Sequence, residues 1–265
     1  MQPGVSDLEL AVLYKYSVQH DWEVNYAHTP IFCVAYADGF RQGQGYVNAR
    51  SQSGLCRIGG AYVCREVFTV SGQDRTVRAA TVRLRKTGSP GPLAVRLEDA
   101  SGAAIGEGSV PAEAIGTESD WVSCRFATDC ALKSGRQYAL VLAAPQGDPY
   151  EIFPLQKGIP HGFGCPQIFA DGWFESTDDA TYNGSKHDVD MQFYLTAVPA
   201  CGSIRGDANL DCRTNILDLI FIRNRLNLSV WRADAWQADV NRDGAVNILD
   251  LIDVRSRMGG TENDE

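Results

Sequence analysis

The sequence predicts a mainly β protein, an antiparallel β-sandwich, followed by a small α-helical module. Two observations predict this order. From about Tyr62 to Val198, short runs of alternating, β-branched or aromatic residues are separated by Gly, Pro, Ser and Asp, which is the pattern of antiparallel strands. After Pro199 the apolar residues recur at helical spacing, in 216–226 and 248–258.

Six runs are expected to be strands of the sandwich. In residues 81–85, Val82 and Leu84 alternate with polar residues, so one face of that strand is buried and the other meets water. Residues 86–92 are rich in turn formers, which predicts a hairpin or a tight connection. The expected strands are Tyr62–Val70, Thr76–Lys86, Leu93–Glu98, Trp121–Ala127, Gln137–Ala143 and Val189–Val198.

The first sixty residues are rich in loops, and Leu8–Val24 is open to two interpretations, the start of a helix or a long strand. We therefore divide the chain into four parts. These are an N-terminal extension of loops and short strands at 1–60, a β-sandwich at 61–199, a helical module at 200–260 and a tail at 261–265.

Composition excludes several classes of partner. The 265 residues carry 24 Lys and Arg against 33 Asp and Glu, so no basic excess is present to bind nucleic acid. No apolar run approaches the roughly 18 residues of a membrane span, so we expect no membrane insertion. Eight cysteines without zinc-type spacing favour disulfides, and hence an extracellular setting, over buried thiols. They are Cys33, Cys56, Cys64, Cys124, Cys130, Cys165, Cys201 and Cys212.

The helical region contains an internal duplication. Residues 207–226 and 239–258 are identical at eleven of twenty positions. In each copy Asp or Asn stands at positions 1, 3, 5, 9 and 12, and position 7 offers a backbone carbonyl. Calcium takes roughly six to eight oxygen ligands, which a twelve-residue loop can supply. The duplication therefore predicts two structural Ca²⁺ sites, formed by Asp207, Asn209, Asp211, Arg213, Asn215 and Asp218, and by Asp239, Asn241, Asp243, Ala245, Asn247 and Asp250.

These residues resemble the type I dockerin family, whose hallmark is a duplicated Asp-x-Asn-x-Asp-Gly calcium loop followed by one helix. The Asn-Ile-Leu-Asp-Leu-Ile strings at 215–220 and 247–252 fit that pattern, and the resemblance covers about residues 205–259. It implies binding to a cohesin-like module and attachment of a secreted protein to a scaffold or cell surface. The partner surface would comprise Ile216, Leu217, Arg223, Ile248, Leu249 and Arg255.

Two features depart from the family pattern. Position 6 of the first loop is Cys212, where a positive φ normally requires Gly, as at Gly244. Cys201 lies eleven residues upstream of Cys212, so a disulfide between them could tie the linker to the loop. Positions 10 and 11 are Ile-Leu in both copies, where cellulosomal dockerins usually carry a Ser-Thr-like pair. Docking of the module onto its own sandwich is therefore an alternative to cohesin binding.

The apolar residues of the two helices are expected to form the core of the module, with Trp231 and Trp236 covering it. They are Leu217, Ile220, Leu226, Leu249, Ile252 and Met258. The sandwich region loosely resembles the jelly-roll-like accessory domains found beside dockerins in secreted bacterial proteins, so we expect an extracellular or cell-surface protein of bacterial origin.

Catalysis is not expected, because the sequence contains no Gly-x-Ser-x-Gly elbow, His-Glu-x-x-His motif or phosphate loop. One carboxylate cluster beside aromatic residues could cleave a glycosidic bond, and it is equally typical of a solvated turn. It consists of Asp171, Glu175, Asp178 and Asp179.

The favoured function is therefore non-catalytic extracellular attachment or assembly, and two alternatives remain. The apolar run Leu8–Tyr16 could add to a sheet edge of another copy and build a fibre. Aromatic side chains of the sandwich could instead stack on sugar rings in a carbohydrate-binding accessory module, although burial in the core is the competing explanation for each. The candidates are Tyr150, Phe153, Trp173, Phe174 and Tyr182.

Overall fold

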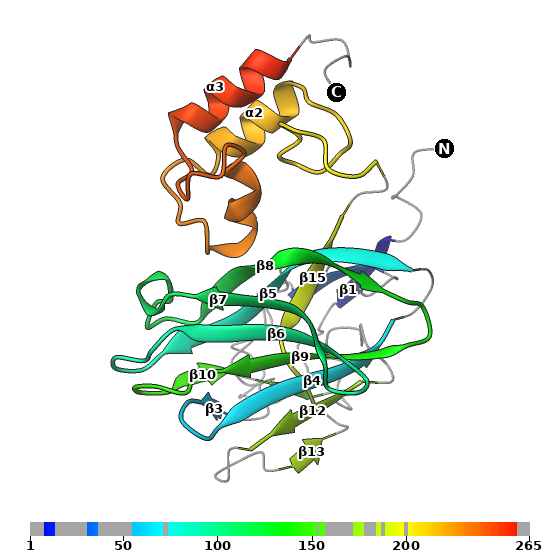
Figure 1. Ribbon diagram of the computed structural model, residues 1–265, viewed down its shortest axis with the longest axis vertical. Coiled ribbons are helices and arrows are strands. Elements are labelled where there is room, and N and C mark those ends of the chain that lie inside the picture. The colour runs from blue at the N-terminus through cyan, green and yellow to red at the C-terminus, as the bar shows by residue number, and fades with distance from the viewer. Residues whose placement is uncertain are drawn as a thin grey trace, which may run out of the picture.

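The computed structural model describes residues 8–13, 31–36, 55–70, 74–152, 154–156, 172–177, 184–186, 189–198 and 201–258. These residues form mainly antiparallel β-sheets, followed by two short helices near the C-terminus (Figure 1). The predicted fold class is confirmed. Within this part of the chain, no helix is long and apolar enough to cross a membrane.

The first sheet is built around the long strand β5 (Arg75–Lys86). On one side β5 pairs with β8 (Asp120–Leu132), and on the other it pairs with β15 (Phe193–Ala197) and β10 (Tyr150–Ile152). The short strand β3 (Cys56–Ile58) continues the sheet beyond β10. All of these pairings are antiparallel.

The second sheet has the order β13-β12-β4-β9-β6-β7. Two smaller pairs lie outside the main sheets, β1 with β2 and β11 with β14. A 3-10 turn, η2 (Ala112–Ala114), follows β7. The strands of the second sheet and the small pairs are β4 (Val63–Thr69), β6 (Leu93–Asp99), β7 (Ala104–Val110), β9 (Gln137–Ala143), β12 (Trp173–Ser176), β13 (Gly184–Lys186), β1 (Leu8–Leu13), β2 (Ile31–Tyr36), β11 (Leu155–Gln156) and β14 (Val189–Asp190).

The two large sheets enclose one apolar core. Val82 and Leu84 enter it from the first sheet, and Leu97 and Leu140 enter it from the second. Val82 and Leu84 are buried and Arg83 between them is only partly covered, as the alternation predicts. Thr81 is also buried, where it hydrogen-bonds Ser123 Oγ at 2.8 Å, so the expectation that this face meets water is wrong at Thr81. This arrangement of two facing antiparallel sheets is a β-sandwich.

The turn-rich segment 87–92 makes a tight connection, but not a hairpin. It joins β5 of the first sheet to β6 of the second. Pro90 and Pro92 have no backbone N–H to donate to a hairpin ladder. The segment instead bonds to the loop before β10, where Gly91 N donates to Gln146 O at 2.8 Å and Thr87 N donates to Pro149 O at 3.1 Å.

The expectation of disulfides is met by some cysteines only. Cys201 and Cys212 form a disulfide. Cys124 and Cys130 are buried free thiols on β8, so the disulfide prediction is wrong for them; their side chains enter the apolar core. The Sγ atoms of Cys56 and Cys64 lie 3.0 Å apart in that core. The side chain of Cys33 and all of Cys165 lie outside the described residues.

The C-terminal helices are α2 (Ile216–Arg223) and α3 (Ile248–Arg257), joined by a connector that contains the 3-10 helix η3 (Ala233–Ala238). This module has a separate small core, made of Ala208, Ile222, Ala238, Val246 and Val254.

The module rests on the free edge of β8, with η3 between the sheet and the helices (Figure 1). Ser123 N donates to Trp231 O at 2.7 Å, and Arg232 forms an isolated bridge with Val122. The Trp231 side chain packs against the sandwich core. The expectation that Trp231 covers the module core is therefore wrong, because the connector extends the first sheet and directs this ring toward the sandwich.

Candidate functional site

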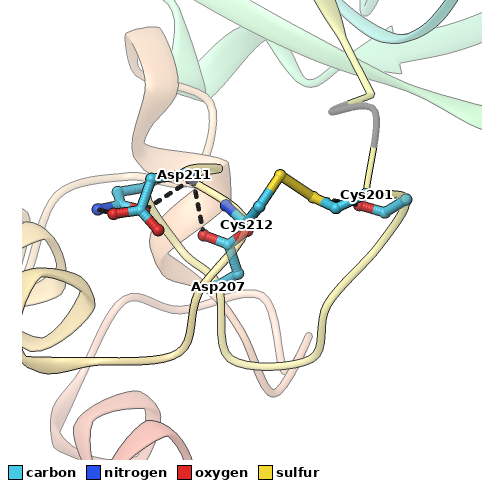
Figure 2. Close-up of a disulfide and its surroundings, with 6 residues drawn as sticks. Cys201, Asp207, Asp211 and Cys212 are labelled. Atoms are coloured by element: carbon cyan, nitrogen blue, oxygen red, sulfur yellow. Dashed lines mark hydrogen bonds between the residues drawn. A yellow bond between two sulfur atoms is a disulfide. The ribbon is translucent and has the colours of Figure 1, made fainter. Parts of the chain in front are cut away.

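The first candidate calcium loop is closed by its own carboxylates. Asp207 at position 1 accepts hydrogen bonds from the backbone N–H groups of Asp211 at 3.0 Å and Cys212 at 2.9 Å (Figure 2). Asp218 at position 12 accepts from Ala208 N at 2.8 Å, Asn209 N at 3.1 Å and Asn215 N at 2.7 Å. The buried Asp218 side chain therefore joins both ends of the loop to the start of α2.

The second loop repeats this arrangement. Asp239 accepts from the N–H groups of Asp243 at 3.1 Å and Gly244 at 3.0 Å. Asp250 accepts from Asn241 N at 3.3 Å and Asn247 N at 2.8 Å. The sequence duplication is thus also a duplication of side-chain geometry.

The position 9 residues begin the helices. Asn215 Oδ1 accepts from Leu217 N at 2.7 Å, and Asn247 Oδ1 accepts from Leu249 N at 2.7 Å. Each forms a capping box with the Asp at position 12. The same residues therefore close the loop and fix where its helix starts.

The backbone of both loops is left-handed at positions 4 and 6, where residue types differ between the copies. Leu210 and Arg242 at position 4 have φ values of 61° and 64°. Cys212 and Gly244 at position 6 have φ values of 71° and 89°. Cys212 therefore adopts a conformation that favours Gly, and its disulfide to Cys201 holds it there (Figure 2).

Burial is the main cause that raises the pKa of the Asp207, Asp218 and Asp239 carboxyl groups, and neighbouring carboxylates add to it. Backbone hydrogen bonds lower the same pKa values without cancelling the effect of burial. In the described part of the chain, none of these three carboxylates forms an ion pair with Lys or Arg. A bound cation would offset this unfavourable charge.

The donor set of each loop fits a hard cation, because every side chain at positions 1, 3, 5, 9 and 12 offers oxygen. The carboxylates at positions 1 and 12 accept hydrogen bonds from backbone N–H groups of the same loop. Among the described residues, no three His, Cys, Asp or Glu side chains are grouped so as to hold a metal ion. The position 7 residues Arg213 and Ala245 are exposed, as expected where only the backbone would contribute.

The expected core residues of the helices are mostly on the surface. Six Ile and Leu side chains at equivalent positions of α2 and α3 are 46–60% exposed, namely Ile216, Leu217, Ile220, Ile248, Leu249 and Ile252. The prediction that Leu217, Ile220, Leu249 and Ile252 form the core is therefore wrong; only Leu226 and Met258 of that set pack against it. The structure places Arg223 and Arg255 on the surface as well.

Residues 205–258 match the family model of the dockerin type I domain. The resemblance read from the sequence is confirmed for this part of the chain. No curated protein matches the chain significantly. Dockerin domains bind cohesin modules and generally bind calcium, so the match implies a role in extracellular protein–protein assembly.

The sandwich offers less support for the other candidate sites. Glu175 lies 3.5 Å from Arg65 and accepts from Trp173 Nε1 at 2.6 Å, whereas Asp171, Asp178 and Asp179 lie outside the described residues. Tyr150 and Phe174 are buried, so they cannot stack on a sugar. Trp173 is partly exposed, and Phe153 and Tyr182 are outside the described residues.

The strand at Leu8–Leu13 pairs with Ile31–Tyr36 of the same chain, so the helical interpretation of its first residues is wrong. The fibre and glycan alternatives stay predictions. Sequence reasoning left docking of the module onto the sandwich open as an alternative, but it missed the residues that form the contact. Arg78 of β5 binds Asp129 in a bidentate pair and donates to Ser203 Oγ at 2.5 Å. A single Arg in an alternating strand is part of no sequence motif, so nothing in the sequence indicated this contact.

Proposed function

We propose that this chain is a secreted, non-catalytic protein that attaches its β-sandwich to a cohesin-type partner through residues 205–258. The observation that carries the proposal is the set of six exposed Ile and Leu side chains on α2 and α3. Apolar side chains that remain exposed on a folded module are typical of a protein-binding surface. Arg223 and Arg255 flank this surface and would supply its polar rim.

The module has two distinct sides, and this supports cohesin binding as well as docking onto the sandwich. The connector, through Trp231 and Arg232, contacts β8. The Ile-Leu pairs at 216–217 and 248–249 stay exposed with that contact in place. Intramolecular docking is therefore compatible with an outside partner, and the two alternatives from the sequence become complementary.

Two calcium ions would stabilise the module. Asp207, Asn209, Asp211, Asn215 and Asp218 would hold one, with the Arg213 carbonyl, and the equivalent residues 239–250 would hold the other. When bound, calcium supplies positive charge to buried carboxylates whose pKa values are raised in its absence. Its binding free energy would add to the folding stability of the module.

The direct test is binding of the full chain to a panel of cohesin modules by biolayer interferometry, in calcium and in chelator. We expect calcium-dependent binding that Leu217→Asp together with Leu249→Asp weakens strongly. Because the two repeats present the same side chains, either substitution alone should weaken it less. Ala104→Asp, on the exposed start of β7 in the sandwich, is the control. Equal binding by the double variant and the control would contradict the proposal.

The non-catalytic assignment has its own test. The chain is incubated with a set of polysaccharides, and released reducing sugars are compared between the native protein and Glu175→Gln. We expect no release above background from either. Hydrolysis by the native protein that Glu175→Gln abolishes would assign a glycosidase site to β12.

A further inference from the structure

A cavity of about 390 Å³ lies between the sandwich and the module. Arg78 of β5 and Arg125 of β8 line it from the sandwich side, and Arg205 and Arg242 line it from the calcium-loop segments of the module. Neither half of the protein forms this cavity alone, because it exists only where the module rests on the first sheet.

The arginines of the cavity differ in how their charge is balanced. Arg78 forms its bidentate pair with Asp129. No described carboxylate lies within ion-pair distance of Arg125, Arg205 or Arg242. The two acidic residues on the wall, Asp207 and Asp239, are bonded to backbone N–H groups of their own loops. Asp129 also attracts Arg125 and Arg242, so four arginines around the cavity share the three carboxylates of Asp129, Asp207 and Asp239.

Arg125 is a half-buried residue in the wall of the cavity. Its guanidinium carbon is 5.9 Å from the centre of the Trp236 ring. Burial lowers the pKa of Arg125, and repulsion from Arg242 and Arg78 lowers it further, against weaker opposing effects of Asp129 and Asp239. Arg78, Arg125 and Arg242 therefore repel one another across the contact, and Asp129 offsets part of this repulsion.

Two buried donors on η3 lack acceptors. Trp236 Nε1 and Gln237 Nε2 are buried and have no hydrogen-bond partner among the described residues, and the Gln237 residue is 7% exposed. Both residues line the cavity. Buried polar groups are almost always hydrogen-bonded, and an unsatisfied buried donor destabilises the fold. The missing component is therefore an acceptor, the same kind of group that the arginines require.

We propose that this cavity is a binding site for a small oxyanion, a group of the sulfate, phosphate or carboxylate type, held between Arg125 of the sandwich and Arg242 of the module. Trp236 and Gln237 would donate to its remaining oxygens. Charge-assisted hydrogen bonds from Arg to an oxyanion are stronger than neutral ones, and the planar guanidinium matches two oxygens at once. A bound anion would also fasten the module to β8, since its ligands come from both parts.

The proposal is tested by titrating the full chain with sodium sulfate at constant ionic strength, with sodium chloride as the exchanged salt. Sodium succinate forms a second arm that distinguishes an inorganic tetrahedral anion from a carboxylate. Isothermal titration calorimetry measures binding, and tryptophan fluorescence follows Trp236. We expect saturable binding of at least one of the two anions, accompanied by a rise in unfolding temperature.

Variants locate the site. Arg125→Gln and Arg242→Gln should each weaken binding by about tenfold or more, because each removes a charge-assisted contact. Arg136→Gln, an exposed arginine in the turn between β8 and β9, should leave affinity unchanged. Trp236→Phe keeps the ring and removes the N–H, so it should weaken binding by a few-fold without removing it. Circular dichroism confirms that each variant is folded.

Absence of saturable binding by both anions would overturn the proposal and leave the cavity to water. Equal losses for Arg125→Gln and Arg136→Gln would show general charge screening, and would overturn it as well. This site does not depend on cohesin binding or on catalysis, so the outcome is separate from that of the proposed function. Each titration is run in calcium-free and in calcium-containing buffer, so that anion binding in the cavity can be distinguished from effects on the calcium loops.

Discussion

The disulfide between Cys201 and Cys212 offers a quantitative test of how the first loop is stabilised. The two variants to compare are Cys201→Ala with Cys212→Ala, and Cys201→Ala with Cys212→Gly. Both remove the cross-link, but only the second places Gly at the left-handed position, where φ is 71°. Any difference between them therefore reports backbone strain at residue 212.

The expected magnitudes follow from the loop length and from that φ value. A cross-link that closes a loop of roughly 12 residues, given a sequence separation of 11, stabilises the fold by about 3 kcal/mol in the chain-entropy description. A non-Gly residue in the left-handed region costs about 1–2 kcal/mol, part of which Gly gives back through its greater freedom in the unfolded chain. We expect a loss of about 3 kcal/mol for the Ala variant and about 2 kcal/mol for the Gly variant.

The measurement is the free energy of unfolding in urea, with hydrogen exchange on peptides from 201–258 assigning the transition to the module. Gly244→Ala in the second loop is the matched control. Its added methyl group meets nothing within 4 Å, so only its φ of 89° can cost stability. We expect Gly244→Ala to lower the free energy of unfolding by about 1 kcal/mol or more. Equal losses for the Ala and Gly variants of residue 212 would refute the strain argument.

Three further predictions concern titration and thiol chemistry. Burial raises the pKa of Asp207 above its ordinary value, so the folded module favours the protonated carboxyl. In calcium-free buffer this group therefore stabilises the fold at about pH 4, and the stabilisation is lost as pH rises through the folded-state pKa. The unfolding temperature of the module should therefore fall between about pH 4 and pH 7, and excess calcium should reverse the trend; a rising temperature without calcium would contradict this. Burial raises the pKa of Cys124 to about 12, so its thiol should resist iodoacetamide at about pH 8 until the protein is unfolded, as followed by mass spectrometry. The Sγ atoms of Cys56 and Cys64 lie 3.0 Å apart in the core, so refolding in the presence of oxidised glutathione should join them, with the glutathione disulfide reduced to two thiols. Peptide mapping that finds both still reduced after oxidative refolding would count against this.

The two twelve-residue loops could be predicted from sequence because their geometry is local. Each loop uses side chains at fixed spacings to bond its own backbone, so two copies of one pattern indicate two copies of one structure. The strands of the sandwich were visible for a similar reason, since alternation has a period of two on any half-buried strand. The burial of Val82 and Leu84 required no knowledge of which strand lies beside them.

The buried face of the helices could not be predicted in this way, because the loop decides it. The loop draws Asp218 and Asp250 inward to bond backbone N–H groups. Residues four apart share a helix face, so Ile222 and Val254 follow these carboxylates into the core. Ile216 and its neighbours are thereby turned outward. Apolar periodicity alone favoured them as core residues because it cannot weigh a buried carboxylate.

The residues that hold the module on the sandwich could not be predicted from the sequence, although docking itself was one of its alternatives. Their contact determines how a partner is presented. The free edge of a strand such as β8 is a site for pairing with other chains. Residues 231 and 232 occupy part of this edge, and Arg232 Nε lies 3.3 Å from Asp120 Oδ2. A partner bound on α2 and α3 would therefore be held in a defined direction relative to the sheets.

This orientation depends on Trp231, whose ring packs against the sandwich core while its carbonyl accepts from β8. We expect Trp231→Ala to release the module from the sheet because the apolar contact is lost, and to increase the radius of gyration in small-angle X-ray scattering. Val230→Ala is the matched control, since Val230 packs against the module core instead. Cohesin affinity should be unchanged by Trp231→Ala, because the exposed Ile and Leu surface does not include this residue. An unchanged radius of gyration would mean that the contacts of Arg78 and Arg232 hold the module in place without this ring.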